Sequence, residues 1–318
     1  MSYPFSERPL LAFLTDHVRT TVVGRHRARF LNAMTTADFL KAKPGDAGFA
    51  LMATSNGRHI GQVRYEMEAD AIVLVGRGPS VTAVLEGLKK HKVADDVRWS
   101  EPVAEAVLAL YGERATALVE GFFGVTFEGA YFDATWNDTK VRATRIGAVE
   151  SELGRAAVHV RVPVALAPSL RVRLLAAGAE PLDTADWERQ RIEAGWPLDG
   201  LDLGSEDVAL ASERLAATVS WTKGCFLGQE VYVMARDRGE LPKRLRGVMV
   251  PMGVAPTVHS ELLQPEATKV QGLVGSAAPV AGGGYLAMAM LKRKASEPGT
   301  ELALPDGRRV QVIALPRV

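Results

Sequence analysis

The sequence predicts an α+β fold with a small β-barrel at its C-terminal end. Segments of strand and of helix character alternate over roughly the first three quarters of the chain, as in proteins whose helices cover one face of a sheet. After Gly239, the connector GELPKRLRG leads into short β-prone segments separated by the turns PMG, GGG, EPG and PDG. At about 150 residues per domain, 318 residues suggest two domains, which we expect at 1–243 and 244–318.

The spacing of apolar residues identifies the elements of the first domain. Strands are expected at Ile72–Val75, Val107–Tyr111 and Val158–Val164. Helices are expected at Ser80–Val93, Ala115–Phe122 and Trp187–Ala194. Asp183 or Thr184 can cap the last helix, and Gly195 and Pro197 end it.

The stretch Val270–Leu291 has no charged residue and is long enough to cross a bilayer. It contains Gln271, Ser276, Pro279 and a triple glycine at 282–284, however, which suit two short buried strands joined by a turn. We therefore expect no association with a membrane.

Composition excludes several classes of function. The formal net charge is +1, from 38 basic and 37 acidic side chains, so no global field favours nucleic acid or an anionic membrane surface. The run LLAFL near the N-terminus is too short for a signal peptide, and an Arg-rich transit segment is missing, which favours the cytoplasm. The six histidines have no metal-ligand spacing and there is one cysteine, so we expect no metal held wholly by this chain.

That single cysteine, Cys225, lies in the segment KGCFLGQE. A free cysteine is most often a small buried hydrophobe, which is one interpretation of this residue. The other is a functional thiol, because the neighbouring Lys223 favours the thiolate. Four more residues of the segment could shape a site around it: Gly224, Gly228, Gln229 and Glu230.

The string TKGCFLGQE, followed by RG at 238–239 and KR at 243–244, resembles the signature of the YgfZ-type folate-binding proteins, relatives of the glycine-cleavage T-protein (aminomethyltransferase). Three further segments resemble this superfamily: RIEAGWP at 191–197, FL at 30–31 with TTAD at 35–38, and TSNGR at 54–58. The resemblance implies a T-protein-like folate-binding domain and a C-terminal β-barrel, arranged around a central opening that holds tetrahydrofolate or a one-carbon derivative. It also implies support of iron-sulfur enzymes.

The resemblance implies roles for particular residues. Glu193 would accept two parallel hydrogen bonds from the amino-pyrimidine edge of the pterin. Trp196 would line the pterin pocket or belong to the core. Arg238, Lys243 and Arg244 would meet the anionic folate tail or form a solvated connector. The chain departs from the family pattern at Val233-Met234, where relatives carry Ala-Arg, and at His26, where they carry an aspartate.

Three hypotheses follow. The first is a monomeric folate-binding factor that acts on iron-sulfur client enzymes or assembly proteins through Cys225, without direct contact to nucleic acid. The second is an aminomethyl or methyl transferase, against which the segment GRGPS at 76–80 carries no acid. The third is a non-catalytic binding module. We take the first as the main expectation. This chain could give an iron-sulfur cluster one thiolate ligand, so glutathione, a second subunit or a client protein would have to supply the others.

Overall fold

The structure is a computed structural model that describes residues 8–239, 241–267 and 269–316. The chain divides into two compact units, and each is described by itself. Unit 1 contains the described residues up to Met52, together with Ile60–Thr184 and Ser220–Phe226. Unit 2 contains Ala53–His59, Ala185–Val219 and the described residues from Leu227 onward.

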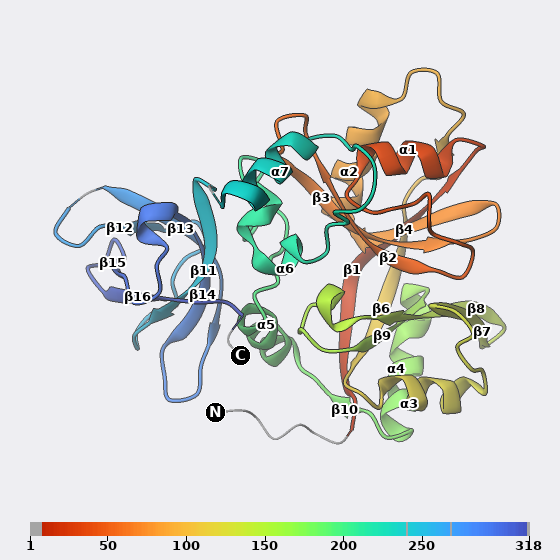
Figure 1. Cartoon of the computed structure of the whole chain (residues 1–318). Coiled ribbons are helices and arrows are strands. Elements are labelled where there is room, and N and C mark those ends of the chain that lie inside the picture. The colour runs from red at the N-terminus through yellow and green to blue at the C-terminus, as the bar shows by residue number, and fades with distance from the viewer. Residues whose placement is uncertain (1–7, 240, 268, 317–318) are drawn as a thin grey trace. The chain divides into compact units, whose positions relative to one another are not determined.

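Unit 1 is built on a ten-stranded sheet (Figure 1). The strand order is β2-β3-β4-β1-β6-β9-β8-β7, with the short strands β5 and β10 also paired to β1. The strands are β1 (Leu10–Val23), β2 (Ala47–Ala53), β3 (His59–Met67), β4 (Ala71–Arg77), β5 (Arg98–Trp99), β6 (Val103–Tyr111), β7 (Tyr131–Trp136), β8 (Thr139–Ile146), β9 (Ala157–Val162) and β10 (Glu180–Pro181).

The long strand β1 joins the two halves of this sheet. It pairs antiparallel with β4 on one side and with β6 on the other. The register with β6 shifts between Leu14 and His17, which marks a bulge. That bulge interrupts the apolar alternation, and it explains why the sequence pattern shows only LLAFL and no strand of this length.

Four helices cover the apolar side of the sheet. They are α1 (Arg27–Met34), α2 (Gly78–His91), α3 (Ala115–Phe123) and α4 (Ala167–Ala176). Helix α2 packs on β1 and β4 and α1 on β4, while α3 contacts β9 and α4 contacts β6 (Figure 1). Along β9, Val158, Val160 and Val162 join the core beneath α3 and α4, whereas His159 and Arg161 alternate with them and belong to the opposite face.

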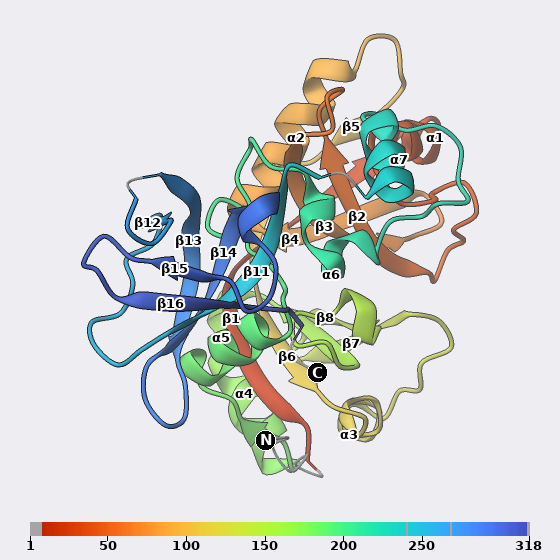
Figure 2. The ribbon, with the colours of Figure 1, turned by 60° about the vertical axis from the view of Figure 1, so that its left-hand side comes forward.

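Unit 2 contains a closed six-stranded barrel in the order β11-β14-β13-β12-β15-β16 (Figure 2). Its strands are β11 (Lys243–Val250), β12 (Glu261–Leu263), β13 (Val270–Pro279), β14 (Tyr285–Lys292), β15 (Glu301–Ala303) and β16 (Arg309–Ile313). The helices of this unit are α5 (Thr184–Glu193), α6 (Glu213–Ala216) and α7 (Gln229–Arg238).

The predicted fold class is confirmed. The apolar stretch 270–291 forms β13 and β14, joined at the triple glycine, whose three residues all have positive φ. The strands expected at 72–75 and 107–111 lie within β4 and β6, and the helices expected at 80–93, 115–122 and 187–194 correspond to α2, α3 and α5. Strand β9 ends at Val162 rather than Val164, because Pro163 lacks an N–H and a 3-10 turn begins after it. Within the described residues, the helices are all too short or too polar to span a membrane.

Candidate functional site

Charged side chains are buried on the sheet face that turns away from α3 and α4. Glu66 of β3 lies at the centre, and its side chain is 3% exposed. Its Oε2 accepts hydrogen bonds from Arg161 Nη2 at 2.6 Å and from Arg142 Nη1 at 3.0 Å, and its Oε1 accepts one from Thr144 Oγ1 at 2.6 Å. A buried carboxylate requires such pairing because desolvation of an isolated charge costs several kcal/mol.

These contacts show that the sheet is strongly curved. Strand β3 is second in the strand order, and β9 and β8, which carry Arg161 and Arg142, are sixth and seventh. Only a sheet that bends back on itself can bring these strands within hydrogen-bond distance across one face. The pairs continue outward, since Arg161 also donates to Glu105 and Arg142 binds Asp133 through two nitrogens.

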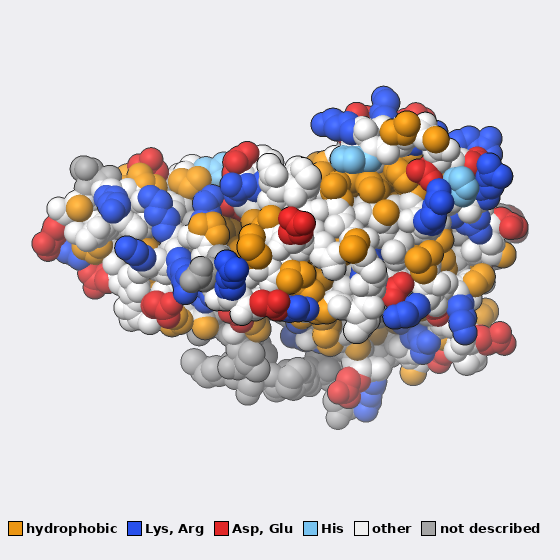
Figure 3. All heavy atoms as spheres, turned by 45° about the horizontal axis from the view of Figure 1, so that its top comes forward, with side chains coloured by type: hydrophobic (Ala, Val, Ile, Leu, Met, Phe, Trp, Pro, Cys, Tyr) orange, Lys and Arg blue, Asp and Glu red, His pale blue; other side chains and the backbone are white. Residues whose placement is uncertain are grey.

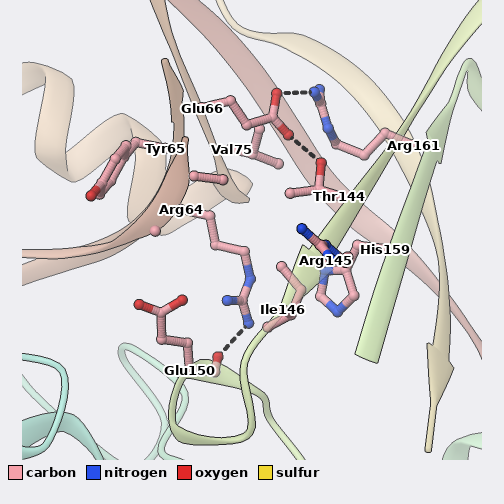
Figure 4. Close-up of a pocket in the computed structure, with 12 residues that line it drawn as sticks. Arg64, Tyr65, Glu66, Val75, Thr144, Arg145, Ile146, Glu150, His159 and Arg161 are labelled. Carbon is pink, nitrogen blue, oxygen red and sulfur yellow. Dashed lines mark hydrogen bonds and ion pairs between the residues drawn. The ribbon is translucent and has the colours of Figure 1, made fainter. Parts of the chain in front are cut away.

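A pocket opens beside this cluster (Figure 4). Five strands and one turn line it: Ala47 and Gly48 of β2, Arg64, Tyr65 and Glu66 of β3, Val75 of β4, Thr144, Arg145 and Ile146 of β8, His159 and Arg161 of β9, and Glu150. Its volume is about 20 Å³, roughly the room of one water molecule. A larger ligand would therefore have to bind at the rim, where Tyr65 and Glu150 are half-buried.

A second buried carboxylate, Glu152, orders the wall of the pocket. It accepts hydrogen bonds from Arg64 Nη2 at 2.6 Å and from Tyr111 Oη at 3.1 Å, and His159 Nε2 lies 3.4 Å away. Burial alone would raise the pKa of Glu152, but Arg64 and His159 outweigh it and hold this pKa well below its usual range. Burial lowers the pKa of His159 despite the neighbouring carboxylate, which favours the neutral imidazole.

Glu150 differs from the other carboxylates of this region. Its carboxylate makes no hydrogen bond or ion pair with another described residue, although its backbone oxygen accepts from Arg64 Nη2 at 2.7 Å. Burial raises the pKa of Glu150, and the Arg64 charge only partly opposes this shift. Burial, with Glu150 and two aspartates nearby, raises the pKa of Tyr65 to about 12. The rim therefore presents a carboxylate and a neutral phenol.

In unit 1, the structure joins the KGC segment to the TTAD segment. Lys223 is buried, and its Nζ donates to the backbone oxygens of Asn32, Thr35 and Ala37 at 2.5, 2.6 and 2.7 Å. The Ser220 N–H donates to the Thr36 carbonyl close by. Burial lowers the pKa of Lys223 to about 8, with Asp38 acting in the opposite direction. The ammonium thus holds the turn that follows α1, a structural role that the sequence did not reveal.

Cys225 is exposed, and so is Gly224 before it. Both lie between two buried side chains, Lys223 and Phe226, and the Lys223 Nζ lies 5.2 Å from the Phe226 ring centroid. The interpretation of Cys225 as a small buried hydrophobe is therefore wrong. The functional interpretation of this thiol stays a prediction, as does the effect of Lys223 on it.

In unit 2, the TSNGR turn packs against the start of α7. Gly228 has φ +79°, and a Cβ there would lie 2.4 Å from the Thr54 carbonyl oxygen. Gly57 has φ +70°, and a Cβ there would lie 2.6 Å from the Cβ of Val231. Both positions thus exclude other residues. Gln229 and Glu230 lie in the first turn of α7. The Glu230 side chain is exposed, and its negative charge interacts favourably with the helix dipole.

The RIEAG segment contributes to the interior of unit 2. Arg191 is fully buried, and its Nη1 lies 2.9 Å from Asp202 Oδ2. Asp202 also accepts from the backbone and side chain of Ser276 on β13. Glu193 is 29% exposed, and its Oε2 lies 3.0 Å from Arg189 Nη1, so its carboxylate is already engaged. Trp196 is buried, with the Arg214 guanidinium 5.8 Å from its ring centroid.

The three cations expected at the folate tail have different surroundings. Arg238 is exposed at the end of α7. Lys243 Nζ lies 2.7 Å from Asp207 Oδ1, and Arg244 Nη2 donates to the Gly239 carbonyl at 3.1 Å. The assignment of these residues to a folate tail stays a prediction.

Sequence reasoning missed the pocket residues Arg64, Glu150 and His159, and it missed Glu152, which accepts a hydrogen bond from Arg64. One signal was present: the strand AVHVRV at 157–162 alternates valines with His159 and Arg161. Polar residues at every second position of an otherwise apolar strand indicate that one of its two faces is buried and polar.

The comparisons with known proteins agree with this fold. The sequence matches no protein-family model. An aminomethyltransferase of Mycobacterium leprae is 27% identical over 252 residues, which cover 75% of this chain and 68% of that protein. An aminomethyltransferase of Mycolicibacterium paratuberculosis is 29% identical over 252 residues, covering 76% and 67%. A putative chloroplastic transferase of Arabidopsis thaliana is 24% identical over 309 residues, covering 95% and 69%.

Among solved structures, the glycine cleavage system aminomethyltransferase T from Bartonella henselae superposes with a TM-score of 0.78. The two are 20% identical in sequence, and the match covers 98% of this chain and 86% of that one. This likeness shows the fold, including the barrel. The chain is thus similar in sequence to these aminomethyltransferases over about three quarters of its length, and it shares its fold with the solved aminomethyltransferase T.

Proposed function

We propose that this protein binds a reduced folate in unit 1 and supports iron-sulfur enzymes through the thiol of Cys225. The observation that carries the proposal is the exposure of Cys225 between two buried anchors. A thiol kept at the surface on a fixed loop is available to a reaction partner, whereas a structural cysteine is normally buried.

The rim of the unit 1 pocket fits one end of a pterin. The amino-pyrimidine edge presents two parallel N–H donors, and the Glu150 carboxylate, which no described side chain engages, can accept both. Arg64 and His159 line the same pocket and supply polar groups for the rest of the ring edge (Figure 4). A bound reduced folate would supply one-carbon chemistry or act as a regulatory ligand.

The experiment compares the two candidate carboxylates by calorimetric titration with tetrahydrofolate. If Glu150 holds the pterin edge, Glu150→Gln weakens binding by about 1.5 to 3 kcal/mol, the range for hydrogen bonds to a charged group. Glu193→Gln then leaves affinity unchanged, because Arg189 already engages that carboxylate. The opposite result would assign the edge to Glu193, as the sequence resemblance implies, and no binding by the wild type would refute the folate proposal.

The iron-sulfur role is tested in a strain that lacks the gene. Cys225→Ala and Cys225→Ser should fold and bind folate normally, since an exposed thiol contributes little to the core. Neither should restore the activities of iron-sulfur enzymes in that strain. Full rescue by Cys225→Ala would refute the role of the thiol.

A transferase activity is the second candidate, and a specific observation favours it. The segment GRGPS has no acid of its own, but Asp16 of β1 pairs with Arg77 at this strand end and lies 3.2 Å from His17 Nδ1. Although burial acts to raise it, the hydrogen bonds of His17 and Arg77 hold the pKa of Asp16 well below its usual range. A carboxylate therefore stands where the sequence alone showed none.

The assay for this candidate is release of methylenetetrahydrofolate from an aminomethyl-loaded carrier protein. Turnover that disappears in Asp16→Asn and persists in Cys225→Ala would favour the transferase over the iron-sulfur role. Absence of turnover in the wild type leaves the first proposal in place.

A further inference from the structure

Positive charge is concentrated in two short segments of this nearly neutral chain. Residues 24–29 and 89–99 carry seven basic and two acidic side chains, a formal charge of +5, while the whole chain carries +1. The rest of the molecule is therefore net negative. The seven cations, which we call the α1–α2 basic surface, are Arg25, Arg27, Arg29, Lys89, Lys90, Lys92 and Arg98.

The fold of unit 1 brings the two segments together. The His26 N–H donates to the Asp96 carbonyl at 3.2 Å, and the Asp96 N–H donates to His26 Nδ1 at 3.1 Å. Arg98 of β5 pairs with Val23 of β1, directly before the first segment. The basic residues at the start of α1 and at the end of α2 thus form one surface, and Figure 3 shows Lys and Arg side chains gathered at this end of the molecule.

The two acids of these segments do not neutralise this surface. Arg29 Nη2 lies 2.6 Å from Asp95, and Arg25 Nε lies 3.6 Å from Asp96, so each carboxylate engages a cation of the same surface. Lys89, Lys90 and Arg98 are exposed and have no carboxylate within ion-pair distance among the described residues. They remain available to an external anion.

An apolar side chain stands among these cations. Val93 follows α2 and is 91% exposed, directly after Lys92. Lys92 Nζ lies 5.7 Å from the Trp99 ring centroid, over the face of the indole. The surface therefore presents a valine, and the aromatic ring near it is already covered.

We propose that the α1–α2 basic surface docks an acidic face of a partner protein, with Val93 as the apolar contact. Protein interfaces combine a dry apolar centre with a polar rim, and complementary charge steers their association. Single-stranded nucleic acid would favour an uncovered aromatic ring for base stacking, which Trp99 does not offer. A lipid surface would bury only one small apolar side chain here, whereas interfacial membrane binding scales with the apolar area buried. The proposal is independent of folate binding.

The test uses the full-length protein labelled with ¹⁵N and four probes. They are an amphipathic Glu/Leu peptide, the same peptide with Gln for Glu, a single-stranded oligonucleotide, and phosphatidylcholine vesicles containing phosphatidylserine. We expect the Glu/Leu peptide to shift the amides of 24–29 and 89–99, and the Gln peptide to bind more weakly. Binding should be measurable at about 0.1 M salt, where charges act over about 10 Å, and lost at about 1 M, where they act over about 3 Å.

Two variants decide which interactions are used. The triple variant Lys89→Glu, Lys92→Glu and Arg98→Glu should weaken the Glu/Leu peptide by about tenfold or more, and all three positions are exposed, so the fold should persist. Arg173→Glu, an exposed cation of α4, is the matched control and should have little effect. Val93→Ser should weaken binding of the Glu/Leu peptide while leaving the salt dependence of that binding unchanged.

Several results would overturn the proposal. Equal affinity for the Glu and Gln peptides would show that charge does not contribute to binding. Preferential binding of the oligonucleotide, together with no effect of Val93→Ser, would identify a nucleic-acid surface instead. Binding of the vesicles alone would identify a lipid surface, and failure of all four probes would leave the surface without a partner of this chemistry.

Discussion

The Nη2 of Arg161 lies 2.6 Å from the Oε2 of Glu66, although the two residues are 95 positions apart and three strands separate β3 from β9 in the sheet. This pair connects the two halves of the curved sheet in its interior. Both residues also line the pocket, so the contact that closes the sheet also shapes the candidate site.

Removing the Glu66 charge should destabilise the protein strongly. Glu66→Gln removes the negative charge that both the Arg161 and the Arg142 guanidinium groups bind. Breaking a buried ion pair typically costs about 3 to 5 kcal/mol. Denaturant unfolding measures the free energy. Glu68→Gln is the control, because this residue contacts the same Arg142 but is 33% exposed. Equal effects of the two variants would show that burial of Glu66 is unimportant.

The free energy of unfolding should decrease as pH falls, and protonation of His159 should cause the first decrease. Burial keeps the folded-state pKa of His159 below 6.5, so the unfolded chain binds the proton first, and stability is lost as pH falls below that value. Below 4.5, Glu152 adds a further loss because its folded-state pKa is also lowered. Glu150 acts in the opposite direction, since its pKa is raised, and offsets part of the loss.

The comparison of wild type with His159→Gln isolates the first of these steps. Melting temperatures measured from about pH 7.5 to about pH 5 should converge as pH falls if His159 causes the loss. His91→Gln, which changes an exposed histidine, should run parallel to the wild type. Parallel curves for both variants would contradict the assignment.

Two glycines of the KGCFLGQE segment should respond differently to the same substitution. Gly228→Ala places a methyl group against the Thr54 carbonyl at a positive φ, and overpacking plus strain should cost more than about 2 kcal/mol. Gly224→Ala meets no atom within 4 Å and should change stability by less than about 0.5 kcal/mol. Thermal melting of the pair distinguishes them, and similar values would contradict the close approach.

Lys223→Met should loosen the turn after α1. The substitution leaves the carbonyls of Asn32, Thr35 and Ala37 without their common donor, at about 1 to 3 kcal/mol for a buried unsatisfied group. Hydrogen exchange of residues 32–38 should accelerate. Lys41→Met, an exposed lysine paired with Asp38, is the control. Unchanged exchange in Lys223→Met would show that the ammonium does not hold this turn.

The elements that the sequence predicted are those with an uninterrupted period. Strand β4 and helices α2 and α3 have regular apolar spacing, and the structure has them at the expected places. Strand β1 was missed because the bulge near Asp16 and His17 breaks its alternation. A local pattern carries no information on such a shift in register, which is set by the partner strand.

The site was predictable only in part for a related reason. The motifs identified segments that the fold does bring into contact, such as Thr54–Arg58 with Gly228. The pocket residues come from strands that are distant in sequence, and a charged residue within a strand is ordinarily taken to face solvent. Glu66 and Arg161 are buried only because each has the other as its partner, and this pairing depends on the curvature of the whole sheet.

The short loop that carries the only thiol limits what the thiol can reach. Cys225 lies two residues after Lys223 and one before Phe226, and both neighbours are buried. Because an extended residue spans at most about 3.6 Å, the Cα of Cys225 stays within about 7 Å of one anchor and about 4 Å of the other. The sulfur therefore cannot swing out to search for a reactant. An electrophile, metal or disulfide would have to reach the thiol at this fixed point of the surface.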